Sequence, residues 1–482
     1  MPTEMNKVKI ITSLIWKFME LGGTQGMQLI VQIVLARLLA PEQFGTIALV
    51  TVFISIARVF IQSGFNTALI QKRDPDEVDF SSVFYISLSL AGILYMIIYF
   101  TAPLISIFYR DPILTSVLRV LSLTLFFGAF NSIQNAYIAK KMMFKKLFIS
   151  SLGAILISGI IGIIAAFNEL GIWALVIQQL VNQISITIIL LAIVSWRPKL
   201  VFSIKRVKLL FSFGWKLLAS TLLETIYREI RTLIIGRAYS SAMLGLYNRG
   251  EQFPKVIVAN INGSIQSVML PTLSACQDDK EKVKRMVRRS IVSSSFLIFP
   301  MMVGMAAVAE PLVKIVLTDK WLPAVPFLQI FSISYALMPI HTANLQSLNA
   351  MGRSDIFLKL EIIKKVIGIF ILFISMHFGI YAIAFGMLIS GLISSFINAY
   401  PNKKLLNYGY FEQIRDIMPS LSISIVMGIA VYTLNSLDII AWKMLIFQVI
   451  TGVIVYVSLA TAFRNESLNY FITTIKELLL RK

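Results

Sequence analysis

One stretch indicates the layout of this chain: LARLLAPEQFGTIAL at residues 35–49, which aligns with IGRAYSSAMLGLYNR at residues 235–249. The alignment pairs Gly45 with Gly245, at an offset near 200 residues. A fixed offset between similar segments is the signature of an internal repeat, which many membrane transporters contain. The sequence therefore predicts two related halves.

A second pair of segments agrees with this register. SLIWKFME at residues 13–20 aligns with SFGWKLLA at residues 212–219, so that Lys17 is paired with Lys216. Six predicted helices separate the two copies. Because this number is even, both halves should have the same orientation in a membrane.

The composition predicts a chain whose solvent is lipid. Of 482 residues, 57% are hydrophobic and only 14% are charged, which is far from the balance of soluble proteins. A bilayer core of about 30 Å takes about 20 apolar residues per helix. Such stretches recur along the chain; the first, residues 11–39, is too long for a signal-peptide core and is expected to remain as a helix.

The predicted fold is an all-α integral membrane protein of about fourteen transmembrane helices. These helices are expected near residues 13–37, 44–68, 80–104, 113–137, 146–168, 172–195, 208–235, 242–270, 290–309, 323–347, 358–376, 379–399, 417–435 and 441–462. The repeat then divides the chain into an N-lobe of helices 1–6 (1–198), a C-lobe of helices 7–12 (199–400), and helices 13–14 with a tail (401–482).

The net charge of +20 reflects membrane topology rather than nucleic-acid binding. Lys and Arg gather in alternate loops, for example at residues 140–146, 197–208 and 280–289, whereas the other loops hold few. By the positive-inside rule the basic loops are expected to be cytoplasmic, together with the two termini, which carry Lys7, Lys9, Lys476, Arg481 and Lys482. The segments 199–210 and 278–289 mix basic and apolar residues. They are either amphipathic segments in the inner headgroup layer or plain solvated loops.

Polar stripes run along the first helix of each predicted half. The first stripe consists of Lys17, Thr24, Gln28 and Gln32, and the second of Lys216, Ser220, Glu224, Arg228 and Arg231. Their spacing of three or four residues puts each stripe on one helix face, apart from one longer step after Lys17. Ionisable residues within membrane spans are costly and usually mark a function. Both stripes are therefore expected to face a central cleft.

The arginines of these helices predict an anion site. Glu224 and Arg228 could neutralise each other as a structural pair, because they lie four residues apart. Arg231 and Arg58 of the second helix add positive charge with no comparable set of acids. Guanidinium groups bind phosphate oxygens in a bidentate manner, so a phosphate-bearing substrate is expected.

Amide side chains crowd several other spans, namely Asn131, Gln134, Asn135, Gln178, Gln179, Asn182, Gln183, Asn260, Asn262, Gln266, Asn344, Gln346 and Asn349. The commoner role of such groups is to join helices by hydrogen bonds. The alternative is that some line a hydrophilic path suited to sugar hydroxyls. His341 and His377 are isolated and are expected to have packing roles.

Three segments carry a resemblance to a known family: LARLLAPEQFGTIALV from Leu35, GFNTALIQKRD from Gly64 and LGLYNRGEQFPK from Leu244. With the helix count and the basic loops, the chain resembles the polysaccharide branch of the multidrug/oligosaccharidyl-lipid/polysaccharide (MOP) flippase superfamily, the Wzx-like exporters. The resemblance implies two six-helix lobes, a cationic cavity and a place in the bacterial inner membrane with both termini in the cytoplasm. It implies movement of an undecaprenyl-pyrophosphate-linked oligosaccharide to the periplasmic leaflet for O-antigen, colanic acid or exopolysaccharide synthesis.

The partners expected are therefore this lipid-linked oligosaccharide and membrane lipids, with a polysaccharide polymerase and a chain-length regulator as further candidates. No cofactor or metal is expected, and the chain contains no GxxxxGK[ST] nucleotide-binding motif. Two alternatives remain open. One is an ion-coupled multidrug exporter of the same superfamily, whose cleft would need carboxylates for cationic drugs. The other is a membrane polymerase or glycosyltransferase, for which Glu310 and Asp319 are the only close pair of outer acids.

Overall fold

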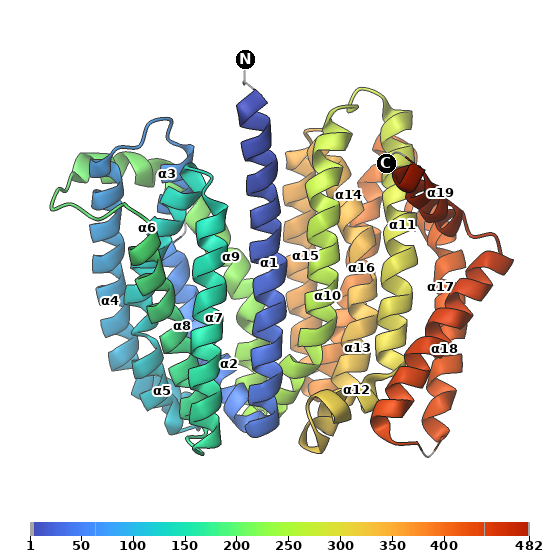
Figure 1. Cartoon of the computed structure of the whole chain (residues 1–482), viewed down its shortest axis with the longest axis horizontal. Coiled ribbons are helices and arrows are strands. Elements are labelled where there is room, and N and C mark those ends of the chain that lie inside the picture. The colour runs from blue at the N-terminus through green and yellow to red at the C-terminus, as the bar shows by residue number, and fades with distance from the viewer. Residues whose placement is uncertain (1–3, 63, 438, 481–482) are drawn as a thin grey trace. The chain divides into compact units, whose positions relative to one another are not determined.

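Figure 1 shows the computed structural model of the chain, which describes residues 4–62, 64–437 and 439–480. Every regular element within these residues is a helix, and no strand occurs among them. The chain forms two compact units, residues 1–245 and residues 246–482, called here the first and second units. The lobe boundaries expected at residues 198 and 400 rest on the repeat and stay a prediction.

The first unit contains nine helices within the described residues. They are α1 (Glu4–Leu38), α2 (Pro41–Gln62), α3 (Phe65–Gln71), α4 (Glu77–Tyr109), α5 (Ile113–Leu121), α6 (Thr124–Lys140), α7 (Phe144–Phe167), α8 (Ile172–Ile193) and α9 (Ile204–Ala238). Within this unit α7 packs against both α1 and α8, while α9 packs against α2, α3 and α4.

The helix α10 (Ser241–Ser274) crosses the boundary, and the other helices belong to the second unit. They are α11 (Lys280–Ala307), α12 (Ala309–Val316), η1 (Asp319–Ala324), α13 (Val325–Ala336), α14 (Met338–Ala350), α15 (Ser354–Ser375), η2 (Met376–Phe378), α16 (Ile380–Leu406), α17 (Tyr410–Thr433), η3 (Leu434–Ser436), α18 (Ala441–Ala462) and α19 (Glu466–Leu480). In this unit α11 packs against α13, α14 and α17, and α16 against α13 and α15.

The all-α membrane class is confirmed. Within the described residues, twelve helical segments are long and apolar enough to cross a membrane. The helices α9 and α10 are among the twelve, although both carry several charged residues. Two further long helices, α1 and α15, coincide with predicted spans but lie outside this set. The count of fourteen and the repeat layout therefore stay predictions, and the chain is a multi-pass membrane protein.

Two segments expected to be either amphipathic segments of the headgroup layer or solvated loops begin long helices instead. Residues 204–210 form the first turns of α9, and residues 280–289 form the first turns of α11. The start of α11 is fixed by Asp279, whose side chain accepts a hydrogen bond from the backbone N–H of Lys282 at 2.9 Å. The basic residues of these segments thus extend the helices beyond their apolar part.

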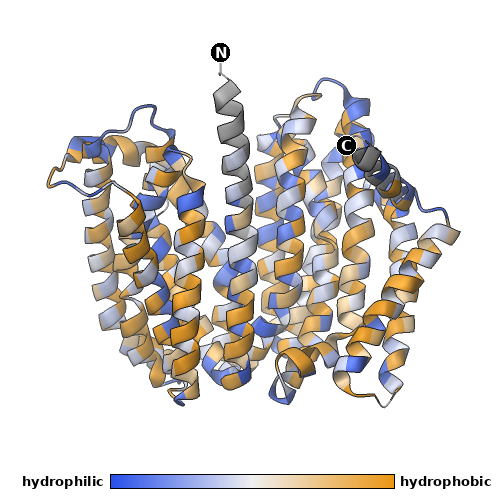
Figure 2. Cartoon of the chain, in the orientation of Figure 1, coloured by the Kyte–Doolittle hydropathy of each residue, from blue (hydrophilic) through white to orange (hydrophobic). Residues whose placement is uncertain are grey.

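The lipid-facing surface is visible in α4. Its exposed apolar side chains include Ile93, Met96, Ile97, Phe100, Leu104 and Ile107. They recur every three or four residues, so they share one helix face, and in lipid this exposure costs nothing. Figure 2 shows the same pattern in both units, with apolar residues along the helices and hydrophilic residues gathered mainly in the connections and at helix ends.

Each unit has its own core. In the first, Trp196 packs within a cluster that includes Phe80 and Phe84, with ring centroids 5.9 and 6.5 Å away. In the second, α11 is tied to α18 by Tyr456, whose hydroxyl donates to the carbonyl of Phe296 at 2.8 Å. Burying these rings and satisfying the hydroxyl fixes the helix positions within each unit.

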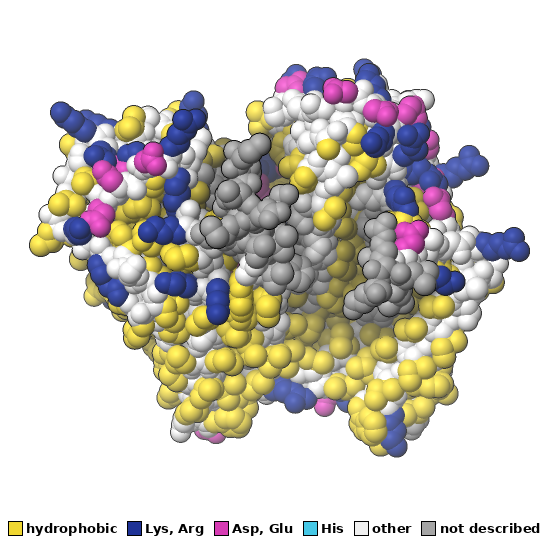
Figure 3. All heavy atoms as spheres, turned by 45° about the horizontal axis from the view of Figure 1, so that its top comes forward, with side chains coloured by type: hydrophobic (Ala, Val, Ile, Leu, Met, Phe, Trp, Pro, Cys, Tyr) yellow, Lys and Arg dark blue, Asp and Glu magenta, His cyan; other side chains and the backbone are white. Residues whose placement is uncertain are grey.

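Basic side chains gather at one end of the helices in each unit, as Figure 3 shows for the face turned forward. In the first unit the buried carboxylate of Asp79 contacts Lys72 at 2.5 Å and Arg206 at 3.2 Å. Asp79 also forms a capping box with Asp76, which begins α4. The predicted terminal charges at Lys7, Lys9, Arg481 and Lys482 have side chains outside the described part of the chain.

Candidate functional site

A polar pocket lies within the first unit, among α1, α2, α6 and α8. Its volume is about 140 Å³. The lining residues are Gln28 of α1, Thr51, Ile54, Ser55 and Arg58 of α2, Thr124 of α6, and Gln178, Gln179, Asn182 and Gln183 of α8. The helical repeat explains the grouping, because steps of three and four residues put each helix's members on one face. The pocket thus joins Arg58 and Gln28, two of the predicted site residues.

Arg58 is the one charged residue in this lining. Its Nε atom is buried and has no hydrogen-bond partner, and within the described part of the chain its side chain makes no ion pair. A guanidinium without a counter-charge inside a membrane span is strongly unfavourable unless a ligand or water compensates it. This imbalance is typical of a binding site rather than of a structural pair.

Contacts with α6 and α7 fix the positions of the α8 amide residues around Arg58. Asn182 donates to the Ser158 hydroxyl of α7 at 3.2 Å, and the backbone carbonyl of Gln183 accepts from Asn131 of α6 at 3.3 Å. Gln178 fits closely against α7 because Gly162 has no side chain: a Cβ there would lie 2.7 Å from the Gln178 Cβ. The α8 wall is therefore positioned before any ligand arrives.

The arrangement suits a small anion. A guanidinium offers a planar fork of donors that matches two phosphate oxygens, and the surrounding amides and hydroxyls add donors at fixed positions. A volume of 140 Å³ corresponds to about four or five water molecules, which accommodates a phosphate group but not an oligosaccharide.

The predicted stripe on α9 is solvent-accessible in the structure. Lys216, Ser220, Glu224 and Arg228 are exposed, and Arg231 is half-buried. Arg228 donates from Nε to its neighbour Glu229 at 3.1 Å, with 57% of the Arg228 side chain still exposed. Such residues are excluded from contact with lipid tails by their charge, so this face requires an aqueous environment. None of the five lines the Arg58 pocket.

The stripe on α1 divides into two parts. Lys17 forms an ion pair with Glu20 at 2.6 Å, which neutralises it locally. Gln28 lines the Arg58 pocket, whereas Gln32 is half-buried and is not among the lining residues. The prediction also missed Thr51 and Ser55. Their spacing with Arg58, at i, i+4 and i+7, was the signal that could have revealed a polar face on α2.

Three buried amides of the second unit join helices, which is the commoner of the two roles expected. Asn344 of α14 and Gln413 of α17 exchange hydrogen bonds of 2.8 and 2.9 Å, and Asn402 of α16 donates to Asn344 at 2.6 Å. All three are fully buried. His341 also has a packing role, because it lies 3.1 Å from the Asn398 amide.

A family described as polysaccharide biosynthesis proteins matches residues 34–326, more than half of the chain. The chain belongs to this family. The matched region begins with the repeated stretch at residues 35–49 and includes all of the Arg58 pocket except Gln28.

Named relatives of this polysaccharide biosynthesis protein come from several bacteria. It is 22% identical to the succinoglycan biosynthesis transport protein ExoT of Rhizobium meliloti, over 76% of this chain and 74% of that protein. It is 27% identical to the teichuronic acid biosynthesis protein TuaB of Bacillus subtilis, over 62% of each chain. It is 24% identical to the lipopolysaccharide biosynthesis protein WzxC of Escherichia coli, over 84% of each chain.

Solved structures agree on the fold. The inward closed conformation of the lipid II flippase MurJ matches with a TM-score of 0.76 and 18% identity, covering 95% of this chain and all of that one. An inward-facing multidrug resistance MATE transporter of the MOP superfamily matches with a TM-score of 0.60 and 15% identity, covering 83% and 96%. These likenesses show that the chain shares its fold with MurJ and with MATE transporters.

Proposed function

We propose that this protein flips a lipid-linked oligosaccharide from the cytoplasmic to the periplasmic leaflet of the bacterial inner membrane, for surface polysaccharide synthesis. The carrier in this proposal is undecaprenyl pyrophosphate, and the mechanism is alternating access. The relatives are named for three different polysaccharides, so the proposal specifies the carrier and the step rather than the sugar.

The observation that carries the proposal is Arg58. Its guanidinium is uncompensated in a polar pocket of about 140 Å³, and the pocket's other polar groups are amides and hydroxyls. A phosphate of the carrier would supply the missing negative charge, while the glycan would lie outside the pocket. Binding of this kind can be reversed, because one arginine with neutral donors attracts a phosphate without enclosing it in a charged cage.

The exposed stripe of α9 supports a hydrophilic path for the rest of the substrate. Its charged groups include both signs, with Glu224, Arg228 and Lys216 exposed along a membrane-spanning helix. Such a face needs water or polar ligands. In the proposal Arg228 and Arg231 contact the pyrophosphate or the first sugars during transport, whereas Lys17, neutralised by Glu20, has a supporting role.

The same observations weigh against the two alternatives. A pocket for cationic drugs would need a carboxylate, but the one charged lining residue is an arginine. The membrane-enzyme alternative depended on the outer acids Glu310 and Asp319. The carboxylate of Asp319 lies 3.8 Å from the Lys314 ammonium group, which is the geometry of an ordinary surface ion pair. The protein's further partners in this proposal are a polymerase and a chain-length regulator, which would act after the flipping step.

The test is complementation of a flippase-null strain with Arg58→Gln, Arg228→Ala and Arg231→Ala. We expect Arg58→Gln to abolish surface polysaccharide while the protein remains in the membrane at normal amount, with the lipid-linked oligosaccharide accumulating on the inner leaflet. Lys314→Ala, which alters an exposed ion pair, is the matched control and should complement fully. Normal polysaccharide from Arg58→Gln would overturn the assignment of the pocket.

A further inference from the structure

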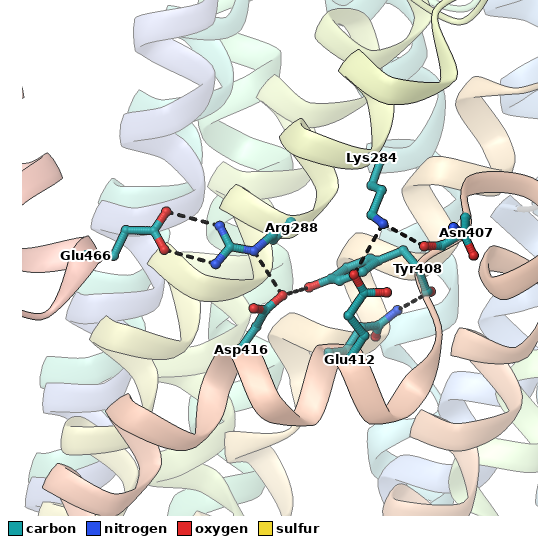
Figure 4. A network of polar contacts seen from close by, with 8 residues as sticks. Lys284, Arg288, Asn407, Tyr408, Glu412, Asp416 and Glu466 are labelled. Atoms are coloured by element: carbon teal, nitrogen blue, oxygen red, sulfur yellow. Dashed lines mark hydrogen bonds and ion pairs between the residues drawn. The ribbon is translucent and has the colours of Figure 1, made fainter.

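A second basic site lies in the second unit, where α11 meets α19. The side chain of Arg288 lies between two helices, as Figure 4 shows. Its two terminal nitrogens donate to Glu466 of α19 at 3.1 and 3.0 Å, and its Nε donates to Asp416 of α17 at 3.0 Å. Two carboxylates therefore neutralise Arg288 completely, and its role is to hold α17 and α19 against α11.

Neighbouring contacts make this junction rigid. The Tyr408 hydroxyl donates to Asp416 at 2.7 Å, and Lys284 contacts Glu412 at 3.2 Å and donates to the Asn407 carbonyl at 2.7 Å (Figure 4). Each acid of the network is thus paired with a base of α11. The three carboxylates exceed these two bases by one charge, and the charge of Glu466 also acts on Arg289, one of the next two arginines of that helix.

Those arginines, Arg285 and Arg289, line a pocket of about 350 Å³ together with Arg288, Val292, Ser293, Glu466, Ser467 and Tyr470. Both are exposed and lie one turn apart on α11. The guanidinium of Arg289 stacks 3.5 Å from the Tyr470 ring centroid, which orients it without neutralising it. Within the described part of the chain, Arg285 has no ion-pair partner. With three arginines and one carboxylate in its lining, the pocket is cationic.

Ser467 supplies an independent sign that the pocket has a ligand. Its side chain is 2% exposed and lines the pocket, and its hydroxyl has no hydrogen-bond partner among the described residues. A buried hydroxyl without a partner destabilises the fold, so such groups are usually satisfied by a ligand or water. A hydroxyl and two guanidinium groups around one space are complementary to a phosphate.

We propose that this pocket binds the phosphate of an anionic phospholipid headgroup. A lipid is favoured over a free phosphate because α11 continues from these arginines into its apolar, membrane-spanning part, starting with Ile291 and Val292. The surrounding segment, residues 280–289, is basic, and basic segments are expected on the cytoplasmic side of the membrane. The lipids of that leaflet carry negative charge. A headgroup bound here bridges α11 and α19, and it shares no lining residue with the Arg58 pocket of the first unit.

The test uses the full chain in nanodiscs of phosphatidylcholine with or without phosphatidylglycerol, and counts retained phosphatidylglycerol by native mass spectrometry. Arg285→Gln with Arg289→Gln should lower its retention about 30-fold, as expected for two arginines at a membrane surface. Ser467→Ala should lower it by a smaller factor of about 5. The matched control is Lys403→Gln with Lys404→Gln, two inner basic residues of α16 outside the pocket, and should change retention less than twofold.

Inorganic phosphate added at millimolar concentration distinguishes a site for a lipid headgroup from a site for free phosphate. If it displaces phosphatidylglycerol fully, the site recognises free phosphate and the lipid assignment is overturned; resistance supports it. Equal retention by the double variant and the wild type would also overturn the proposal. If the double variant does not fold, the single Arg285→Gln is used instead, because this exposed side chain supports no contact; its retention must still fall.

Discussion

The backbones of Gly45 and Gly245 pass so closely that neither position has room for a side chain. A Cβ on Gly45 would lie 3.0 Å from the Gly245 nitrogen, and a Cβ on Gly245 would lie 3.2 Å from the Gly45 nitrogen. Each would also overlap a backbone carbonyl, that of Ser241 or of Pro41. The repeat alignment pairs these same two glycines, so equivalent positions of the predicted halves meet where α2 and α10 begin.

Gly45→Ala and Gly245→Ala should each destabilise the protein by about 3 kcal/mol or more, because backbone cannot move aside as a side chain can. Thermal unfolding followed by size-exclusion fluorescence would measure this. Gly263→Ala on α10 is the control, since a Cβ there meets nothing within 4 Å, and it should be neutral or slightly stabilising. Equal stability of all three variants would contradict the close approach.

The buried amides of the second unit should be energetically coupled. Asn344→Ala and Gln413→Ala each remove a hydrogen-bond partner from the other, whereas the double variant removes both members of the pair. We expect a coupling energy of ~0.5–2 kcal/mol in a double-mutant cycle of unfolding free energies. Asn260→Ala should cost little, because this exposed amide bonds only a carbonyl of its own helix. Additive effects at Asn344 and Gln413 would rule out a shared network.

Neutralising the buried carboxylate of Asp79 should destabilise the protein more than neutralising the exposed carboxylate of Glu77. Asp79→Asn weakens the contacts to Lys72 and Arg206, but both bases are partly exposed and can regain water. The loss of stability should therefore lie below the ~3–5 kcal/mol of a fully buried pair. Glu77→Gln, on the surface beside Lys199, should change the unfolding free energy by less than about 1 kcal/mol. A larger effect at Glu77 would reverse this ranking.

The junction of α11 and α19 should weaken in acid. Hydrogen bonds from Arg288 hold the pKa of Glu466 below its ordinary value of 4.5. The stabilisation of the junction by these hydrogen bonds is therefore complete above pH 4.5, and it is lost as the pH falls through the lowered pKa of Glu466. Because Glu466 is largely exposed, solvent screens part of this effect.

A spin label at Asn469 of α19 would measure that change as mobility. It should become more mobile between pH 6 and pH 3 in the wild type. In Glu466→Gln, the label should already be mobile at pH 6 and respond little to pH. A label at the exposed Thr461 of α18 is the control, with no expected change. An unchanged Asn469 signal in the wild type would exclude the acid-sensitive contact.

Much of the fold was readable from hydropathy because each membrane-spanning helix must satisfy its own backbone hydrogen bonds within about 20 apolar residues. The predicted spans 172–195 and 441–462 correspond closely to α8 and α18. The amphipathic starts of α9 and α11 were harder to assign. Basic residues mixed with apolar ones are compatible with a loop, a surface helix or a helix that extends out of the membrane.

The candidate site was predicted only in part. Arg58 and Gln28 were selected because charged and amide groups are rare in spans, and both line the pocket. No sequence pattern joined them with Thr124, because a hydroxyl in a span usually bonds a carbonyl of its own helix. The sequence also could not show that Arg58 has no ion-pair partner within the described residues, since any acid of the chain could have been that partner.

The sequence by itself determined the membrane class, the positions of most helices and the excess of arginine, because these follow from local composition and from the cost of exposing backbone or charge to lipid. Only the tertiary structure decided which polar groups satisfy one another. Asn344 bonds Gln413 and Arg288 bonds Glu466 across long sequence separations, while Arg58 and Ser467 keep atoms without partners. Such pairing depends on how helices within a unit pack, and it is what separates structural polar groups from candidate binding sites.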